Sequence, residues 1–194
     1  LKLYRQSVLK AAVEGRLTAE WREKHESELE PSSELLKRIL TERRKKWEAD
    51  QLARFKANGT SPKDDKWKKK YVKPEPSNND EKANNIPSNW TKVRLEQISL
   101  LITKGSSPKW QGFEYMESGI PFVRSQNVLW GYLDLSDVAH LSKGFNEKEK
   151  KSVLKEGDVL LNIVGASIGR AAIVNHSIQG GNVNQAVAVI RLPH

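Results

Sequence analysis

The amino-acid pattern changes near Trp90, and this change limits the architectures that the chain can adopt. Before Trp90 the residues are strongly charged and rich in helix formers. After it come short runs rich in Val and Ile, separated by Gly, Asn, Ser and Lys, which is typical of an irregular, mostly antiparallel sheet. The runs predict strands at 91–95, 97–103, 120–124, 128–135 with a turn at Gly131, 158–164, 171–174 and 186–192, and one short helix is predicted at 146–154 with Ser142 or Asn146 as its cap. We therefore expect an α+β protein in which a long helical spacer, with coiled-coil-like helices, precedes a β-rich domain.

Two helices are predicted within residues 1–56, separated by an irregular stretch at 16–31. The first carries apolar residues at helical spacing and ends at Gly15, a residue that favours helix termination. The second runs from about Ser33 to Lys56 and has a thin apolar stripe. We predict that this stripe packs against another helix, in this chain or in another subunit, through Leu36, Ile39, Leu40, Trp47 and Phe55.

The length of the second helix suggests a spacing role. Its 24 predicted residues would span about 36 Å at about 1.5 Å per residue. One turn of B-DNA covers roughly 34 to 36 Å, so the helix could hold two DNA-reading modules one turn apart. An interaction helix without such a role fits the same pattern.

Residues 57–89 are rich in Lys, Asn and Pro and are predicted to form a linker. Trp67 and Tyr71 are the exception, because they lie four residues apart within the basic run and could pin it onto a neighbour. A Lys-rich stretch with interleaved aromatics can touch nucleic acid, but a solvated linker has the same composition. We then place a β domain at 90–194.

The composition limits the kinds of binding partner and the cellular compartment that we expect. The formal charge of +9 divides into +6 for residues 1–89 and +3 for residues 90–194, which favours polyanions without separating DNA from RNA or anionic lipid. The absence of cysteine excludes disulfides, Cys-based zinc sites and thiol nucleophiles. Because no apolar run reaches membrane-spanning length and the first residues are too polar for a signal peptide, we expect a soluble, cytoplasmic protein.

The sequence offers no recognisable catalytic or metal-binding cluster. The Gly-rich segment at 165–170 is too short for a phosphate-binding loop and lies between two predicted strands, which indicates a hairpin turn. No methyltransferase motif is present, and the four histidines lie far apart without acidic neighbours at ligand spacing. We therefore predict no metal, no cofactor bound by this chain and no catalysis by the chain alone.

Polar side chains at predicted strand ends and turns are the remaining candidates for function. Arg and Lys match the edge of guanine, and Asn and Gln match that of adenine. Asn and Gly in loops also form turns without any ligand, so the turn-forming interpretation stays open. The candidate DNA contacts are Lys104, Ser106, Ser107, Lys109, Arg124, Ser125, Gln126, Asn127, Arg170, Asn182, Asn184 and Gln185.

Several segments, in this order, resemble the specificity subunits of type I restriction-modification enzymes. Residues 3–22 and 30–59 are similar to the conserved spacer of that family. The later segments IPSNWTKVRLEQI, GIPFVRSQNV, LKEGDVLLNIVGASIGRAAIV and NVNQAVAVIRL, together with a Gly-Ser-Ser-Pro loop at 105–108, resemble the start of a target recognition domain. The resemblance covers nearly the whole chain. Because the helical pattern is under way at Leu1 and the chain stops just after a strand-like run, we expect a fragment that lacks the C-terminal end of this domain.

The resemblance implies a subunit that reads one half of a bipartite site in double-stranded DNA and docks methyltransferase and restriction-translocase subunits. Those partners would use S-adenosylmethionine, ATP and Mg. It leaves open whether the parent is a full-length subunit or a half-length one that forms a homodimer through its helices. Two alternatives remain: the specificity module of a single-chain restriction-methylation enzyme, and a protein-interaction scaffold that does not bind DNA.

Overall fold

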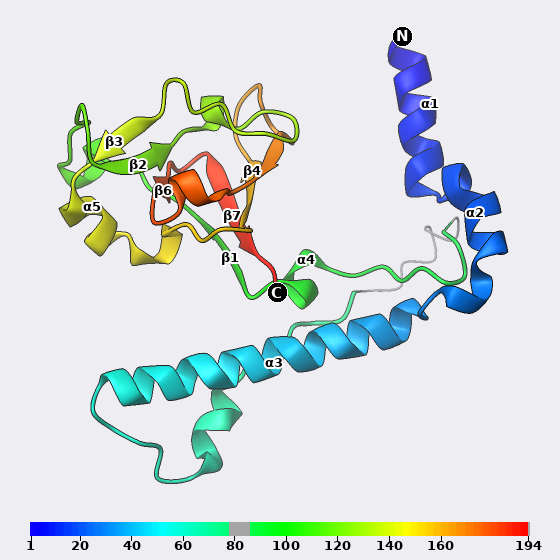
Figure 1. Ribbon diagram of the computed structural model, residues 1–194, viewed down its shortest axis with the longest axis horizontal. Coiled ribbons are helices and arrows are strands. Elements are labelled where there is room, and N and C mark those ends of the chain that lie inside the picture. Colours follow the sequence, from blue (N-terminus) through cyan, green and yellow to red (C-terminus); the bar gives the residue numbers. More distant parts are fainter. Residues whose placement is uncertain (78–85, 194) are drawn as a thin grey trace. The chain divides into compact units, whose positions relative to one another are not determined.

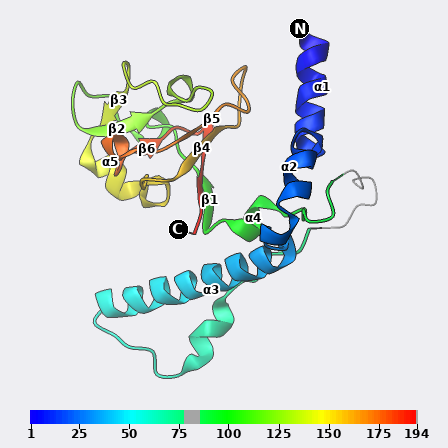
Figure 2. The ribbon, with the colours of Figure 1, turned by 45° about the vertical axis from the view of Figure 1, so that its right-hand side comes forward.

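The structure, a computed structural model, describes residues 1–77 and 86–193. It consists of two compact units, Leu1–Ile98 and Ser99–His194. The first is helical and the second is built mainly from short strands, as Figures 1 and 2 show. The predicted α+β class is confirmed.

The first helix, α1 (Lys2–Val13), ends where the sequence predicts. Gly15 follows it with a φ of 72°, in the left-handed region that glycine enters without steric cost. The Gly15 carbonyl accepts a hydrogen bond of 2.7 Å from the Arg22 guanidinium. This bond fixes the direction in which the chain leaves α1.

The segment after Gly15 is helical, so the prediction of an irregular stretch is wrong. It contains the short helix α2 (Ala19–Lys24) between two 3-10 turns, Arg16–Thr18 and Glu26–Glu28. Within it the Trp21 and His25 rings stack at 4.5 Å. Such contacts between neighbouring turns stabilise a helix too short to show an apolar period.

The long helix α3 (Ser32–Ala57) confirms the second predicted helix to within one residue at each end. None of its 26 residues is fully buried. The five residues of the predicted stripe are instead half-buried, so α3 lies on the surface of its unit. A thin stripe on a polar helix accounts for this partial burial.

The chain returns along α3 after residue 57 and forms a 3-10 helix, η3 (Asp65–Lys70), visible beside the C-terminal half of α3 in Figure 1. Two rings attach it: Trp67 stacks on Trp47 with 6.0 Å between centroids and meets Phe55 edge-on at 6.1 Å. Tyr71 meets Trp47 at 5.3 Å. The aromatic part of the α3 stripe thus has its partner within the chain.

The helix α4 (Leu95–Ile98) occupies residues for which strands were predicted. The Gln97 side-chain oxygen accepts a hydrogen bond of 2.8 Å from the backbone N–H of Arg94, which closes the first turn. This local bond overrides the alternation of apolar and polar residues at 91–95. The strand prediction there is wrong.

The second unit contains two small sheets, with strand orders β1-β7-β4-β5 and β3-β2-β6. Every pair is antiparallel except β2 with β6. This confirms a mostly antiparallel domain, although the sequence reading missed the short β3 and β6. The strands are β1 (Leu101–Lys104), β2 (Ile120–Val123), β3 (Ala139–Leu141), β4 (Val159–Asn162), β5 (Ala171–Ile173), β6 (Asn182–Val183) and β7 (Val187–Arg191).

The core of this unit has an aliphatic part and an aromatic part. Leu160 of β4 and Val189 of β7 are fully buried in the aliphatic part, which accounts for the Val-rich runs. Phe122 and Phe145 form the aromatic part, with 5.6 Å between ring centroids. The aliphatic part contains residues of both sheets and holds them together, whereas the aromatic part packs α5 against β2 and β3.

The short helix α5 (Lys143–Lys148) supplies Phe145 to that core. Its first turn is capped by the Ser142 side chain, which accepts a hydrogen bond from the Phe145 N–H. The sequence predicted a helix at 146–154 with Ser142 or Asn146 as the cap. The helix is therefore shorter and begins earlier than predicted, and a 3-10 turn (Lys150–Ser152) follows it.

Candidate nucleic-acid interface

Strand ends from both sheets come together at one edge of the second unit. Lys104, at the end of β1, lies opposite Ala188 of β7. Asn162, at the end of β4, lies opposite Val187 at the start of β7. Antiparallel pairing therefore brings the loops that follow β1 and β4 to the same side.

The second sheet joins this edge through backbone hydrogen bonds. The Asn184 N–H, just after β6, donates to the Val123 carbonyl at the end of β2 over 3.0 Å. The Ile163 N–H, just after β4, donates to the Ala186 carbonyl over 2.9 Å. We call the resulting set of loops, residues 104–109, 124–137, 163–170 and 184–186, the loop edge.

Gly105 is required for this convergence. A Cβ atom built on Gly105 would lie 1.7 Å from the Val183 carbonyl oxygen, far inside van der Waals contact. The loop after β1 and the end of β6 can therefore approach only because position 105 has no side chain.

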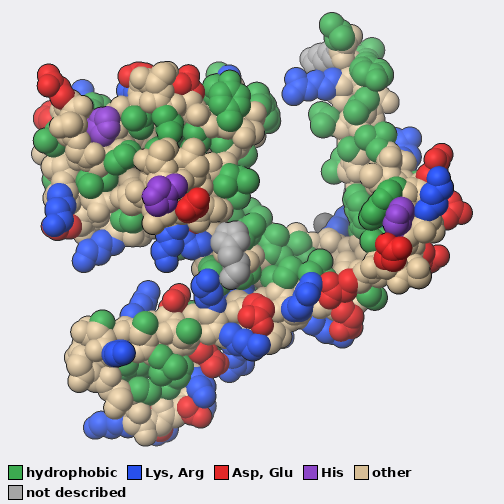
Figure 3. Space-filling view, in the orientation of Figure 1, with side chains coloured by type: hydrophobic (Ala, Val, Ile, Leu, Met, Phe, Trp, Pro, Cys, Tyr) green, Lys and Arg blue, Asp and Glu red, His purple; other side chains and the backbone are tan. Residues whose placement is uncertain are grey.

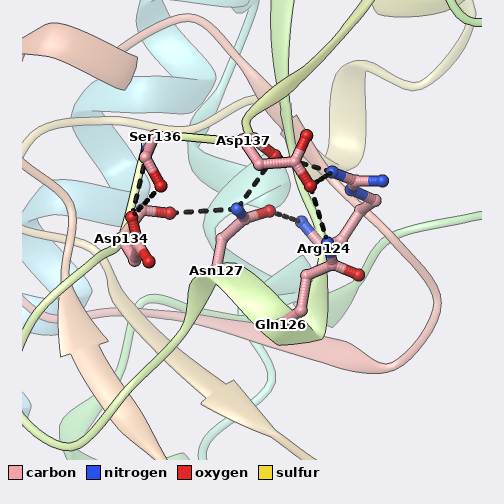
Figure 4. A network of polar contacts seen from close by, with 6 residues as sticks. All are labelled: Arg124, Gln126, Asn127, Asp134, Ser136 and Asp137. Carbon is pink, nitrogen blue, oxygen red and sulfur yellow. Dashed lines mark hydrogen bonds and ion pairs between the residues drawn. The ribbon is translucent and has the colours of Figure 1, made fainter.

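A polar network orders the loop after β2, as Figure 4 shows. The side-chain oxygen of Asn127 accepts from the Arg124 N–H at 2.9 Å, and its Nδ2 donates to the Asp134 carbonyl at 2.9 Å. Asn127 is 3% exposed, so it braces two parts of the loop from inside. Hydrogen bonds from the Ser136 hydroxyl and N–H lower the pKa of the Asp134 carboxyl.

Asp137 connects two of the candidate base-reading side chains. Nη2 of Arg124 donates to the Asp137 carbonyl at 2.6 Å and to its Oδ2 at 3.0 Å. Nε2 of Gln126 donates to the same Oδ2 at 3.0 Å. The Asp137 side chain is 79% exposed, so this arrangement lies where a ligand can reach it.

The candidate DNA contacts differ in exposure. Lys104, Lys109, Gln126 and Gln185 are exposed, whereas Ser106, Ser107, Arg124, Ser125, Arg170 and Asn184 are half-buried. Their contact with DNA stays a prediction. Most of these residues lie on the loop edge, which brings together four groups that are far apart in the sequence.

Asn127 and Asn182 are buried, and this corrects their assignment as base contacts. The Asn182 amide donates to the Glu149 carbonyl at 3.1 Å and to the Ser152 hydroxyl at 3.0 Å. Its side-chain oxygen accepts from Asn146 at 2.8 Å. An amide whose partners are all inside the domain cannot present its edge to a base.

Two exposed apolar side chains on the loop edge, Trp130 and Ile168, were not predicted from the sequence. Trp130 is 63% exposed and Ile168 is 62% exposed. The Gly131 N–H donates to the Ala171 carbonyl at 2.8 Å, which holds the turn containing Trp130 against β5. The Gly131 turn is visible in the sequence, but the exposure of the neighbouring ring depends on packing.

Asn162 is a second residue that the sequence reading missed. It is fully buried at the end of β4, and its Nδ2 donates to the Ser125 carbonyl at 2.8 Å. It therefore connects the β4 strand to the turn that carries Gln126. In the sequence, this role of Asn162 is indicated only by the position of a polar residue at the end of an apolar run.

A carboxylate anchors the far end of the loop after β1. Nε2 of Gln111 donates to the Glu149 carboxylate at 2.6 Å, and the Glu149 residue is 7% exposed. Burial alone would raise the pKa of this carboxyl, but the bonds from Gln111 and Ser106 and the charge of Lys151 outweigh it. The pKa of Glu149 is therefore lowered, so the group is charged at neutral pH.

The loop edge offers hydrogen-bonding and charged side chains. Among residues 1–77 and 86–193, no three His, Cys, Asp or Glu side chains are grouped so that they could hold a metal ion. No helix in these ranges is long and apolar enough to span a membrane. The segment at 165–170 joins the antiparallel strands β4 and β5, which confirms the predicted hairpin turn.

Comparison with known proteins confirms the resemblance to type I specificity subunits. The chain is 33% identical over 107 residues to the specificity subunit of the type I restriction enzyme EcoBI from Escherichia coli, covering 55% of this chain and 22% of the relative. It is 27% identical over 160 residues to the EcoAI specificity subunit from Escherichia coli, covering 82% and 23%. The aligned stretches thus cover less than a quarter of the length of each relative.

A solved structure, the HsdS subunit from Thermoanaerobacter tengcongensis, matches with a TM-score of 0.41 and 20% identity. The match covers 99% of this chain and 37% of that one. No family model matches the chain.

Proposed function

We propose that this chain, a relative of type I restriction enzyme specificity subunits, reads one half of a bipartite site in double-stranded DNA. The observation that carries the proposal is the loop edge, where loops after four strands converge with Lys104, Arg124, Gln126 and Gln185 among their side chains. The similarity to two specificity subunits supports it. In the proposed role the second unit is the target recognition domain.

Arg124 and Gln126 are the proposed base readers. A good bidentate contact of Arg with guanine, or of Gln with adenine, discriminates by about 1 to 3 kcal/mol. The Arg124 Nη2 atom donates to two oxygens of Asp137, so two parallel bonds to a guanine require that Asp137 release it. Reading therefore involves exchange of an internal carboxylate for a base edge.

The helical unit is proposed to act as spacer and docking element. At about 1.5 Å per residue the 26 residues of α3 span about 39 Å, slightly more than one turn of B-DNA. In the proposed assembly the methyltransferase subunits bring S-adenosylmethionine, and the restriction subunit brings ATP and Mg. The chain itself supplies binding and geometry.

A domain exchange tests this proposal. Residues 90–194 would replace the corresponding region of a related full-length specificity subunit, which is then co-expressed with its methyltransferase, and methylated adenines are mapped across the genome. We expect one half of the bipartite motif to change and its spacing to stay the same. An unchanged motif in a folded, assembled complex contradicts the proposal.

Arg124→Ala gives the residue-level test in the same assay. We expect loss of methylation or a relaxed base at one position of the half-site, with an unchanged circular-dichroism spectrum. Lys155→Ala is the matched control, because this exposed cation precedes β4, whereas the loop edge follows that strand. Equal effects of the two substitutions would show that Arg124 contributes charge alone.

A further inference from the structure

We propose that α3 and the segment returning along it bind the phosphate backbone of duplex DNA without reading its sequence. We call residues 32–73 the basic hairpin. This contact would be separate from the loop edge and would lie in the helical unit, to which the proposed function assigns only spacing and docking. The choice of DNA among polyanions rests on the proposed function.

The charge of the chain is concentrated in the basic hairpin. Residues 32–73 contain 14 Lys and Arg against 6 Asp and Glu, a formal charge of +8, whereas the whole chain carries +9. The second unit contains 10 Lys and Arg against 8 Asp and Glu, or +2. The strongest electrostatic attraction for a polyanion therefore comes from the hairpin.

The hairpin holds these charges on a fixed surface. Trp67 and Tyr71 pack on Trp47, and Nη1 of Arg43 donates to the Tyr71 hydroxyl at 2.8 Å. The Lys68 ammonium lies 5.7 Å from the centre of the Trp67 ring. Because the lysines of η3 are anchored in this way, a ligand would lose less conformational entropy on binding than it would with an unpacked linker.

Many cations of the hairpin are available to a ligand. Five of its six acids pair within the hairpin, such as Glu42 with Lys45 at 2.9 Å and Asp65 with Lys68 at 3.0 Å. Among the residues that the structure describes, seven exposed cations of the hairpin have no carboxylate within ion-pair distance. These are Lys46, Arg54, Lys56, Lys63, Lys69, Lys70 and Lys73.

A groove of about 620 Å³ marks where the two arms of the hairpin meet. Lys37, Arg44, Lys45 and Lys73 contribute to its lining, and Glu48 is the one acid among the described residues that line it. Of these cations Lys37, Arg44 and Lys45 each pair with an acid of α3. In Figure 3 both Lys or Arg and Asp or Glu side chains border the apolar cluster at the end of α3. The hairpin thus presents positive charge around a concave surface.

The composition of this surface fits phosphate better than protein. Protein interfaces are depleted of Lys and enriched in exposed aromatics, but the hairpin rings are half-buried against one another. Lys binds phosphate as a point charge and needs no fixed orientation. A surface dominated by lysines that contact phosphate therefore predicts binding that depends on salt and only weakly on sequence.

The test compares two triple variants of the whole chain. Lys69→Gln/Lys70→Gln/Lys73→Gln removes three hairpin charges, and Lys143→Gln/Lys150→Gln/Lys155→Gln removes three exposed charges of the second unit. Binding to a labelled duplex of random sequence is followed by fluorescence anisotropy over a range of salt concentrations. We expect the hairpin variant to bind at least about tenfold more weakly, with the log–log salt slope reduced by about 2 to 3, at about 0.9 per phosphate contact.

The outcomes separate the possibilities. A hairpin variant that binds like the unsubstituted chain, or no worse than the second-unit variant, overturns the inference. So does a hairpin variant that keeps its affinity for duplex but loses affinity for poly-glutamate or for anionic lipid vesicles, because the occupant is then another polyanion. A domain exchange that leaves the methylated motif unchanged defeats the proposed function alone, since duplex binding by the hairpin is measured independently.

Discussion

The buried ion pair between Asp158 and Arg191 gives the sharpest stability prediction. Asp158 precedes β4 and is 1% exposed, and its carboxylate accepts from Nε and Nη2 of Arg191 at 2.7 and 2.6 Å. It also accepts from the Lys155 N–H at 2.8 Å. Asp158→Ala removes all three bonds and leaves the guanidinium, 17% exposed, without its counter-charge.

Breaking one side of a buried pair costs about 3 to 5 kcal/mol. We expect the lower end, because water can reach part of the guanidinium, and therefore a melting temperature for this unit lower by about 12 °C or more. The free energy of unfolding would be measured by urea denaturation of the whole chain, followed by circular dichroism and tryptophan fluorescence. Arg191→Met combined with Asp158→Ala should recover part of the loss, because it removes the stranded charge.

The matched control is Glu147→Ala, which breaks an ion pair with Lys143 whose side chains are 61% and 83% exposed. An exposed pair on a helix contributes about 0.3 to 0.5 kcal/mol, so unfolding should hardly change. If Asp158→Ala costs less than about 1 kcal/mol, this buried pair does not contribute the stability expected of it. Equal effects of the two substitutions would lead to the same conclusion.

Three further predictions address the site and the hairpin. Gly105→Ala should lower the free energy of unfolding by about 3 kcal/mol in a urea melt, because its Cβ would collide with the Val183 carbonyl; a loss below about 1 kcal/mol would show that the backbone can move apart. The lowered pKa of Glu149 stabilises the fold fully above the unfolded-state pKa of about 4.3, and this contribution is lost as the pH falls through the folded pKa, so Glu149→Gln should flatten the acid limb of the pH–stability curve. Trp67→Ala should speed tryptic cleavage at residues 66–70 without changing cleavage in the second unit, and equal rates would mean that the ring does not anchor η3.

The local pattern of residues was enough to predict the elements whose formation depends on neighbouring residues. The helix α3, the stop at Gly15 and the strands β2, β4, β5 and β7 follow from apolar period, glycine and β-branched runs, and the structure has them close to the predicted residues. The family resemblance could also be found without a structure, because it depends on short motifs and on their order along the chain. The irregular stretch before α3 was predicted wrongly because its helical turns depend on individual side-chain contacts.

The functional surface was decided by tertiary structure. Arg124 and Asn127 look alike in the sequence as polar residues at a strand end. In the structure Asn127 is buried and binds the Arg124 N–H and the Asp134 carbonyl, whereas the Arg124 guanidinium reaches the exposed carboxylate of Asp137. Composition gave the charge of the chain, but only the packing of Trp67 on Trp47 turns a predicted linker into a fixed basic surface. The physical reason is that the burial and hydrogen bonding of a side chain depend on residues distant in the sequence. The local pattern of apolar and polar residues cannot predict them.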